Sequence, residues 1–189
     1  YIGDWEIPQP KAHELLVKVH ATALNRADTM QRKGQYPPPP GDSPILGLEI
    51  AGIVTEIGAE VTEYKIGDKV CGLIGGGGYA EYAVIPAKQA LPIPSNLSFE
   101  QAAGIPEVFL TAFQAINWIG KLQKEESILI HAGASGVGTA AIQIAKAIGA
   151  KVFVTASKGK HETCLQLGAE KAIDYKNENF EEKIKEYTD

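Results

Sequence analysis

Cysteine is scarce in this chain, and its scarcity excludes several kinds of protein. The 189 residues contain two cysteines, Cys71 and Cys164, which lie far apart in the sequence. Two cysteines cannot form a disulfide framework, and they cannot supply the four thiolates of a structural zinc site. We therefore expect a protein of a reducing compartment, the cytoplasm, without a structural metal of that kind.

Long apolar runs and an excess of basic charge are also missing. No stretch approaches the ~20 consecutive apolar residues that a membrane-spanning helix needs. The 23 acidic residues outnumber the 18 basic ones, which gives a formal net charge of −5. This acidic balance disfavours nucleic acids and anionic membranes as the main partners. The sequence predicts a globular protein that acts on a small molecule.

The first half of the chain is rich in glycine, proline and β-branched residues. Short alternating runs predict strands at residues 14–19, 49–57 and 79–85. Glycine-containing turns separate these runs. We expect residues 1–97 to form a mostly β domain, a barrel or a sandwich.

From Ser98 onward, helices and strands alternate. Ser98 and Gln101 have the spacing of a capping box, which marks the start of a helix. Short apolar runs predict buried strands, and helical patterns follow each of them: strands at 128–130, 151–155 and 171–174, helices at 137–148, 162–167 and 180–187. This order predicts an α/β domain over residues 98–189, with a parallel, doubly wound sheet.

A glycine-rich turn, residues 131–138, joins the first of these strands to its helix. Gly133 would allow a tight turn, Gly138 would let helix and strand pack closely, and the amides at the helix N-terminus would hold a pyrophosphate. Ser135 replaces the middle glycine of the dinucleotide fingerprint and is small enough for the backbone to approach the phosphates. The pattern predicts a nicotinamide dinucleotide site formed by Gly133, Ser135, Gly136, Val137 and Gly138. The alternative is a glycine turn that holds no ligand.

The end of the second strand of this domain indicates which nicotinamide cofactor is bound. An NAD site usually places an acid about 20 residues after the first glycine, to hold the ribose hydroxyls. Residues 155–160 contain no acid, but they include Ser157, Lys158 and Lys160. Such donors and cations suit a 2′-phosphate, so we expect NADPH rather than NADH. The alternative is that both lysines lie on a solvated helix start.

Several short motifs occur in an order that resembles a known superfamily. They span residues 23–28, 34–38, 47–49, 67–70, 78–82 and 131–138. Together they resemble the medium-chain dehydrogenase/reductase superfamily and, within it, the zinc-free quinone oxidoreductase branch. The resemblance implies a mostly β, GroES-like N-terminal domain, followed by the first half of a Rossmann domain. It also implies a homodimer in the full-length form.

The resemblance makes one replacement informative. Zinc alcohol dehydrogenases of this superfamily carry a histidine in a Gly-His-Glu motif, where this chain has Leu48 between Gly47 and Glu49. They also carry a cysteine near the position of Asn25. Leucine cannot ligate zinc, so we expect no metal site.

Without a metal, the hydride acceptor must already be reactive, as quinones and conjugated enones are. Hydride addition builds negative charge on the carbonyl oxygen, so the protein must position the ring and place donors near that oxygen. By the resemblance, Asn25 and Tyr36 are the expected catalytic residues. The Tyr36 hydroxyl would donate a hydrogen bond or a proton, and the Asn25 amide would donate or hold the nicotinamide. The alternative is a turn asparagine and a packed tyrosine.

The resemblance implies further contacts with the cofactor. Thr111 would lie near the nicotinamide, and Ser157, Lys160 and Tyr175 would surround the 2′-phosphate. The alternatives are an ordinary helix residue for Thr111 and a surface aromatic for Tyr175.

The last predicted helix follows the third strand, so we expect only the first mononucleotide-binding half of the Rossmann domain. We expect a fragment or truncated product with weak or absent turnover of its own. Two other functions stay open. One is a non-catalytic NADPH-binding or structural protein, and the other is an enoyl-thioester reductase.

Overall fold

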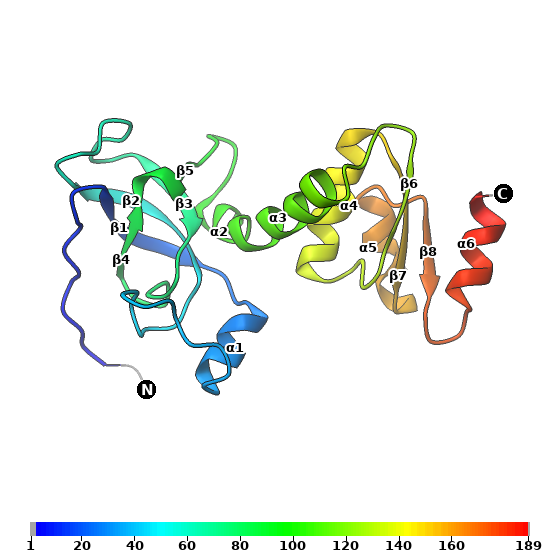
Figure 1. Cartoon of the computed structure of the whole chain (residues 1–189), viewed down its shortest axis with the longest axis horizontal. Coiled ribbons are helices and arrows are strands. Elements are labelled where there is room, and N and C mark those ends of the chain that lie inside the picture. The colour runs from blue at the N-terminus through cyan, green and yellow to red at the C-terminus, as the bar shows by residue number, and fades with distance from the viewer. Residues whose placement is uncertain (1–2, 189) are drawn as a thin grey trace. The chain divides into compact units, whose positions relative to one another are not determined.

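A computed structural model describes residues 3–188, which form two compact units that divide after Glu107 (Figure 1). The division falls after helix α2 (Phe99–Ala103), whereas the sequence led us to place the boundary before it. The reason is packing, because Ala102 and Ala103 of α2 are buried in one cluster with Ala51 and Cys71 of the first unit.

The first unit is built on a five-stranded antiparallel sheet. Its strands are β1 (Glu14–Thr22), β2 (Glu49–Ile57), β3 (Lys69–Leu73), β4 (Tyr82–Pro86) and β5 (Leu91–Pro92). The order in the sheet is β4-β1-β2-β3-β5, and every neighbouring pair is antiparallel. This confirms the predicted β domain, and it adds β3 and β5, which the sequence did not predict. The expected strand at 79–85 begins only at Tyr82.

Apolar side chains of β1 and β2 make the core of this sheet. Leu15 and Val17 alternate along β1 and are fully buried, and Val17 lies opposite Val54 of β2. Ile50 of β2 and Ile85 of β4 belong to the same cluster. The single α-helix between β1 and β2 is α1 (Arg26–Arg32), and a short 3-10 helix, η1 (Ala87–Gln89), follows β4.

The second unit contains a parallel sheet of three strands, in the order β6-β7-β8. The strands are β6 (Ser127–Ile130), β7 (Lys151–Ala156) and β8 (Lys171–Asp174), and all three confirm predicted strands. Helix α3 (Pro106–Phe113) begins two residues before the division. The other helical segments of this unit are the π-helix η2 (Gln114–Ile119), α4 (Gly136–Ile148), η3 (Lys158–Lys160), α5 (His161–Gln166) and α6 (Phe180–Thr188). The alternation of parallel strands and helices is of the Rossmann type, as expected.

Helix α4 lies on this sheet through a face of small residues. Ala140, Ala141 and Ala145 are buried in one cluster with Val152 and Val154 of β7. The helix ends at Gly149, whose φ of 88° is in the left-handed region that favours glycine. Because the strands are parallel, their carboxyl ends meet at one edge of the sheet, where open α/β folds bind ligands.

Candidate nicotinamide site and carboxylate network

The loop between β6 and α4 can be made only with glycine at two positions. A Cβ at Gly133 would lie 2.6 Å from the Cβ of Val154, and one at Gly138 would lie 2.4 Å from the carbonyl oxygen of Ala132. Real Cβ atoms do not approach this closely. Gly133 therefore lets the loop lie directly against β7, and Gly138 lets the start of α4 lie directly against the loop.

Ser135 has a structural role besides its small size. It is the N-cap of α4, in extended conformation, and its Oγ accepts a hydrogen bond of 3.1 Å from the amide of Gly138. This bond satisfies one of the four amides that have no intrahelical partner at a helix start. The amides of Gly136 and Val137, in the first turn of the 13-residue helix, are then in position for an anion.

Thr155 of β7 ties this loop to the sheet. Its carbonyl oxygen accepts from the amide of Gly133 (2.9 Å), and its buried Oγ1 accepts from the amide of Ala132 (3.3 Å). The same Oγ1 lies 3.1 Å from Nδ1 of His131, whose ring meets Phe180 edge-on. The loop is thus fixed before a ligand arrives, which lowers the entropic cost of binding.

The segment after β7 carries the residues expected at the 2′-phosphate. Ser157 is half-buried and is the N-cap of η3, and Lys158 and Lys160 are exposed. Within residues 3–188, neither lysine forms an ion pair. Their positive charges are therefore available at the carboxyl end of β7.

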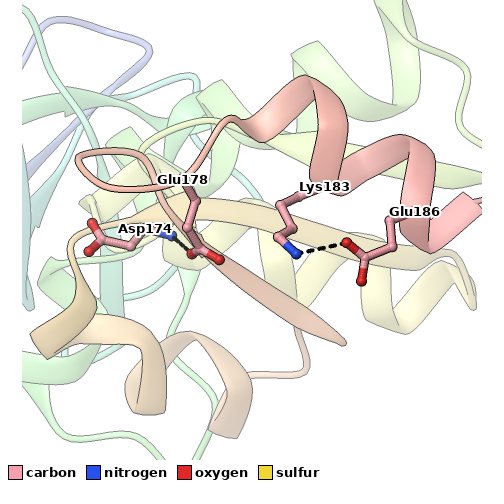
Figure 2. A network of polar contacts seen from close by, with 4 residues as sticks. All are labelled: Asp174, Glu178, Lys183 and Glu186. Atoms are coloured by element: carbon pink, nitrogen blue, oxygen red, sulfur yellow. Dashed lines mark hydrogen bonds and ion pairs between the residues drawn. The ribbon is translucent and has the colours of Figure 1, made fainter.

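The turn after β8 carries Tyr175, which is 56% exposed. It follows Asp174, whose carboxylate accepts from Nδ2 of Asn177 (2.6 Å) and from the amide of Lys176 (3.2 Å). The Asn177 hydrogen bond is the main reason why the pKa of Asp174 lies below its usual range. The amide of Asp174 donates to Glu178, and further along α6 Lys183 pairs with Glu186 (Figure 2).

The expected cofactor residues of the second unit thus gather in part. Gly133, Ser135, Gly136, Val137 and Gly138 form one loop, and Ser157, Lys160 and Tyr175 follow the neighbouring strands β7 and β8. Thr111 lies on α3 with its side chain exposed. Sequence reasoning missed Thr155, and a hydroxyl at the end of the strand beside the glycine loop is the signal that could have found it.

In the first unit, Asn25 is held by two carboxylates. It is the N-cap of α1, and its backbone amide donates to Oδ2 of Asp28 at 2.7 Å. Its side-chain Nδ2 donates to Oε1 of Glu49, also at 2.7 Å. Both N···O distances are at the short end of the range for N–H···O hydrogen bonds, which is usual when the acceptor is a carboxylate.

Glu49 is buried, with 1% of its surface exposed. Besides the bond from Asn25, it accepts the backbone amide of Glu107 at 2.9 Å on Oε2. Burial raises the pKa of Glu49, because loss of hydration disfavours the ionised form more than these two hydrogen bonds favour it. Glu49 stands directly after Leu48, which is itself buried.

Tyr79 joins the same group of residues. Its hydroxyl donates to Oδ2 of Asp28 at 2.7 Å, the oxygen that also accepts the Asn25 amide. Burial and the Asp28 carboxylate raise the pKa of the Tyr79 phenol far above its usual value of 10. The other oxygen of Asp28, Oδ1, is buried and has no partner among the described residues. Tyr79 also lines a shallow groove of about 440 Å³, together with His20, Thr22 and Leu24.

The two expected catalytic residues have different surroundings. Asn25 is embedded in the network of Asp28, Glu49 and Tyr79, whereas Tyr36 is 49% exposed and makes no hydrogen bond within the described part of the chain. Sequence reasoning did not single out Asp28, Glu49 and Tyr79. The signal was present, because each of them lies within one of the short motifs noted above.

Two family models match the chain. Residues 11–95 match the alcohol dehydrogenase GroES-like domain, and residues 136–189 match the zinc-binding dehydrogenase domain. Among solved structures, Escherichia coli quinone oxidoreductase complexed with NADPH superposes with a TM-score of 0.87 at 36% identity, over 98% of this chain and 57% of that one. The chain belongs to the medium-chain dehydrogenase/reductase superfamily.

Within this superfamily, quinone oxidoreductases and an enoyl reductase are among the similar proteins. Mouse quinone oxidoreductase is 37% identical over 185 residues, which are 97% of this chain and 56% of the mouse protein. The structure of CurK enoyl reductase gives a TM-score of 0.89 at 30% identity, over 98% of this chain and 58% of that one. This chain thus spans little more than half of these relatives, and 8 to 10% of the polyketide synthases that it also matches.

A zinc ion, which one family model implies, does not fit the residues present. Leu48 is buried and stands between Gly47 and Glu49. Among residues 3–188, no group of three or more histidine, cysteine, aspartate or glutamate side chains is arranged to hold a metal ion.

In the same part of the chain, every helix is too short or too polar to span a bilayer.

Proposed function

We propose that this chain is the substrate-side domain and the first half of the cofactor domain of a reductase, which transfers a hydride from NADPH to quinones or conjugated enones without zinc. The observation that carries the proposal is the loop of residues 131–138. There, Gly133 and Gly138 permit close contacts that a Cβ would block, and the amides of Gly136 and Val137 lie in the first turn of α4, where a helix start favours an anion. The similarity to quinone oxidoreductases supports the same reading.

The choice of NADPH over NADH rests on the end of β7. No acid stands there to hold the ribose hydroxyls, and Gly159 is flanked by two lysines that form no ion pair within residues 3–188. Ser157 and Tyr175 would add donors to the 2′-phosphate. The E. coli relative was solved with NADPH, which agrees with this choice.

On the substrate side, the first unit offers hydrogen-bond donors rather than a metal. NADPH supplies the hydride when it is bound, and negative charge then develops on the acceptor's oxygen. The Asn25 side chain keeps a second Nδ2 hydrogen besides the one given to Glu49, and the Tyr36 hydroxyl is exposed. In this proposal Asn25 stabilises the oxygen and Tyr36 delivers the proton.

Calorimetric titration of the 189-residue chain with NADPH and with NADH tests the cofactor assignment. We expect NADPH to bind more tightly. K158A and K160A should each weaken NADPH binding by about tenfold and leave NADH binding unchanged, because each removes a charge-assisted contact. K151A, at the opposite end of the same strand, is the matched control. Equal binding of the two cofactors would refute the phosphate pocket.

One other activity is favoured by a specific observation, the similarity to CurK enoyl reductase. An enoyl thioester is also a conjugated acceptor, so the same donors would serve it. Initial rates with a quinone, a simple enone and an enoyl thioester would rank these substrates. Binding of NADPH without turnover of any of these substrates would favour a non-catalytic NADPH-binding protein. For the full-length form, a cytoplasmic homodimer stays our expectation.

A further inference from the structure

Glu49 contacts Asn25 in a way that determines how the Asn25 carboxamide is turned. An ionised carboxylate can only accept hydrogen bonds, so the Asn25 atom that lies 2.7 Å from Oε1 must be the nitrogen Nδ2. The backbone amide of Asn25 is fixed separately by Asp28. With one Nδ2 hydrogen held by Glu49 and the backbone held by Asp28, the direction of the second Nδ2 hydrogen is set.

Both the backbone and the carboxylate of Glu49 are fixed by hydrogen bonds. It is the first residue of β2, where it pairs with Leu73 of β3, and its carbonyl oxygen accepts from Oγ1 of Thr22 at 2.7 Å. Its Oε2 accepts the backbone amide of Glu107. Any rotation of the carboxylate would leave a polar group unpaired, and such a loss is expensive where water is excluded. The orientation that Glu49 imposes on Asn25 is therefore a rigid one.

Burial separates the roles of these two residues. Glu49 is 1% exposed and cannot touch a substrate, whereas Asn25 is partly exposed. We propose that Glu49 is a positioning residue, which turns Nδ2 of Asn25 inward so that Asn25 presents one defined N–H to the oxygen of the hydride acceptor. This inference rests on the proposed function, because it assigns to Asn25 the stabilisation of that oxygen.

The variant Glu49→Gln tests the inference with almost no change of shape. The introduced amide has one oxygen and one NH2 group, but it faces two donors, Nδ2 of Asn25 and the amide of Glu107. One donor must then meet another donor, and the Asn25 carboxamide must reverse or lose its bond. The matched control is Glu56→Gln, which removes the same charge from the same strand at an exposed position.

The first readout is the side-chain amide resonance of Asn25 in a ¹⁵N–¹H spectrum, which does not depend on activity. E49Q should shift this resonance and E56Q should not. The second readout is quinone turnover. E49Q should lower kcat by roughly 100-fold, the cost of losing one donor to a developing oxyanion, with KM for NADPH unchanged.

The double variant E49Q/N25D distinguishes positioning from structural support. The introduced glutamine can donate to the introduced aspartate, so the buried bond is restored with its polarity reversed. The aspartate carries no N–H, so stability should return towards that of the native chain while kcat stays low. If kcat recovers together with stability, Glu49 has only a structural role and the inference is wrong.

The inference is also overturned if the Asn25 side-chain amide has the same chemical shift in E49Q as in E56Q. Failure of the proposed function gives a different pattern, in which the native chain binds no NADPH in the calorimetric titration. In that case the shift of the Asn25 resonance alone decides whether Glu49 orients Asn25.

Discussion

In the second unit the groups that suit a ligand belong mainly to the backbone, whereas in the first unit they are side chains held by buried carboxylates. The amides of Gly136 and Val137 are placed by two glycines and a serine cap within one short loop. Asn25 is placed by Asp28 and Glu49, which come from a helix and a strand. A backbone site of this kind depends on positions where a Cβ would clash with neighbouring atoms. A side-chain site depends on hydrogen bonds between residues that are far apart in the sequence.

The largest expected effect is on the backbone site. Gly138→Ala should destabilise the chain by about 2–3 kcal/mol and abolish NADPH binding, because the new methyl group would overlap the Ala132 carbonyl. Urea unfolding and calorimetry measure the two effects. Gly159→Ala is the stability control, since a Cβ there meets nothing within 4 Å. A G138A chain with native stability would mean that the loop does not need this close approach.

Substitutions in the first unit should have smaller effects on stability, and Tyr79 and Tyr36 should differ in the property that each affects. Tyr79→Phe should cost about 2 kcal/mol of stability, because Asp28 loses a donor. Tyr36→Phe should leave stability unchanged, since its hydroxyl has no partner among the described residues, but it should lower kcat if Tyr36 delivers the proton. Thermal unfolding and quinone turnover of both variants give the comparison. The reverse result, stability lost only in Y36F, would contradict the network.

A smaller effect separates capping from ligand binding at α4. Ser135→Ala should cost about 1 kcal/mol, because the Gly138 amide loses its cap. Ser135→Asp keeps a capping oxygen, so stability should be close to native, but its charge should weaken NADPH binding by at least about tenfold. If S135D binds NADPH as tightly as the native chain, the pyrophosphate does not lie at this helix start.

The smallest effect is a pH dependence of stability in the first unit. Burial raises the pKa of Glu49 above its usual value of 4.5, so Glu49 keeps its proton to a higher pH in the folded chain than in the unfolded chain. Its stabilisation is fully present below pH 4.5 and declines as the pH rises through the raised pKa. The free energy of unfolding of the native chain minus that of E49Q should therefore fall as the pH increases from 4.5. A difference that grows with pH would show that the bonds from Asn25 and Glu107 outweigh burial.

The two sites also differ in how far the sequence predicted them. The glycine loop was predicted residue by residue, because a missing Cβ and a cap are local features that adjacent residues reveal. The strands β2 and β8 were predicted with their observed bounds for the same reason, since alternation and turn residues are local. What this loop binds stays a prediction.

The long-range hydrogen bonds of the carboxylate network could not be predicted in this way. The bond between Tyr79 and Asp28 joins residues 51 positions apart, and the bond between Glu107 and Glu49 spans 58 positions. No periodicity or spacing rule pairs residues at such separations. Strands β3 and β5 were missed because they are specified by their pairing partners rather than by their own pattern.

The topology of the first sheet has a consequence for synthesis on the ribosome. Its five strands all come from residues 14–92 and pair only with one another among the described strands, and α2 ends at Ala103. The ribosome releases the chain from its N-terminus, at about 5–20 residues per second. Every strand of the first sheet is therefore translated before Ser127 begins the second sheet. The nascent chain can complete its antiparallel pairing without competition from the later parallel strands.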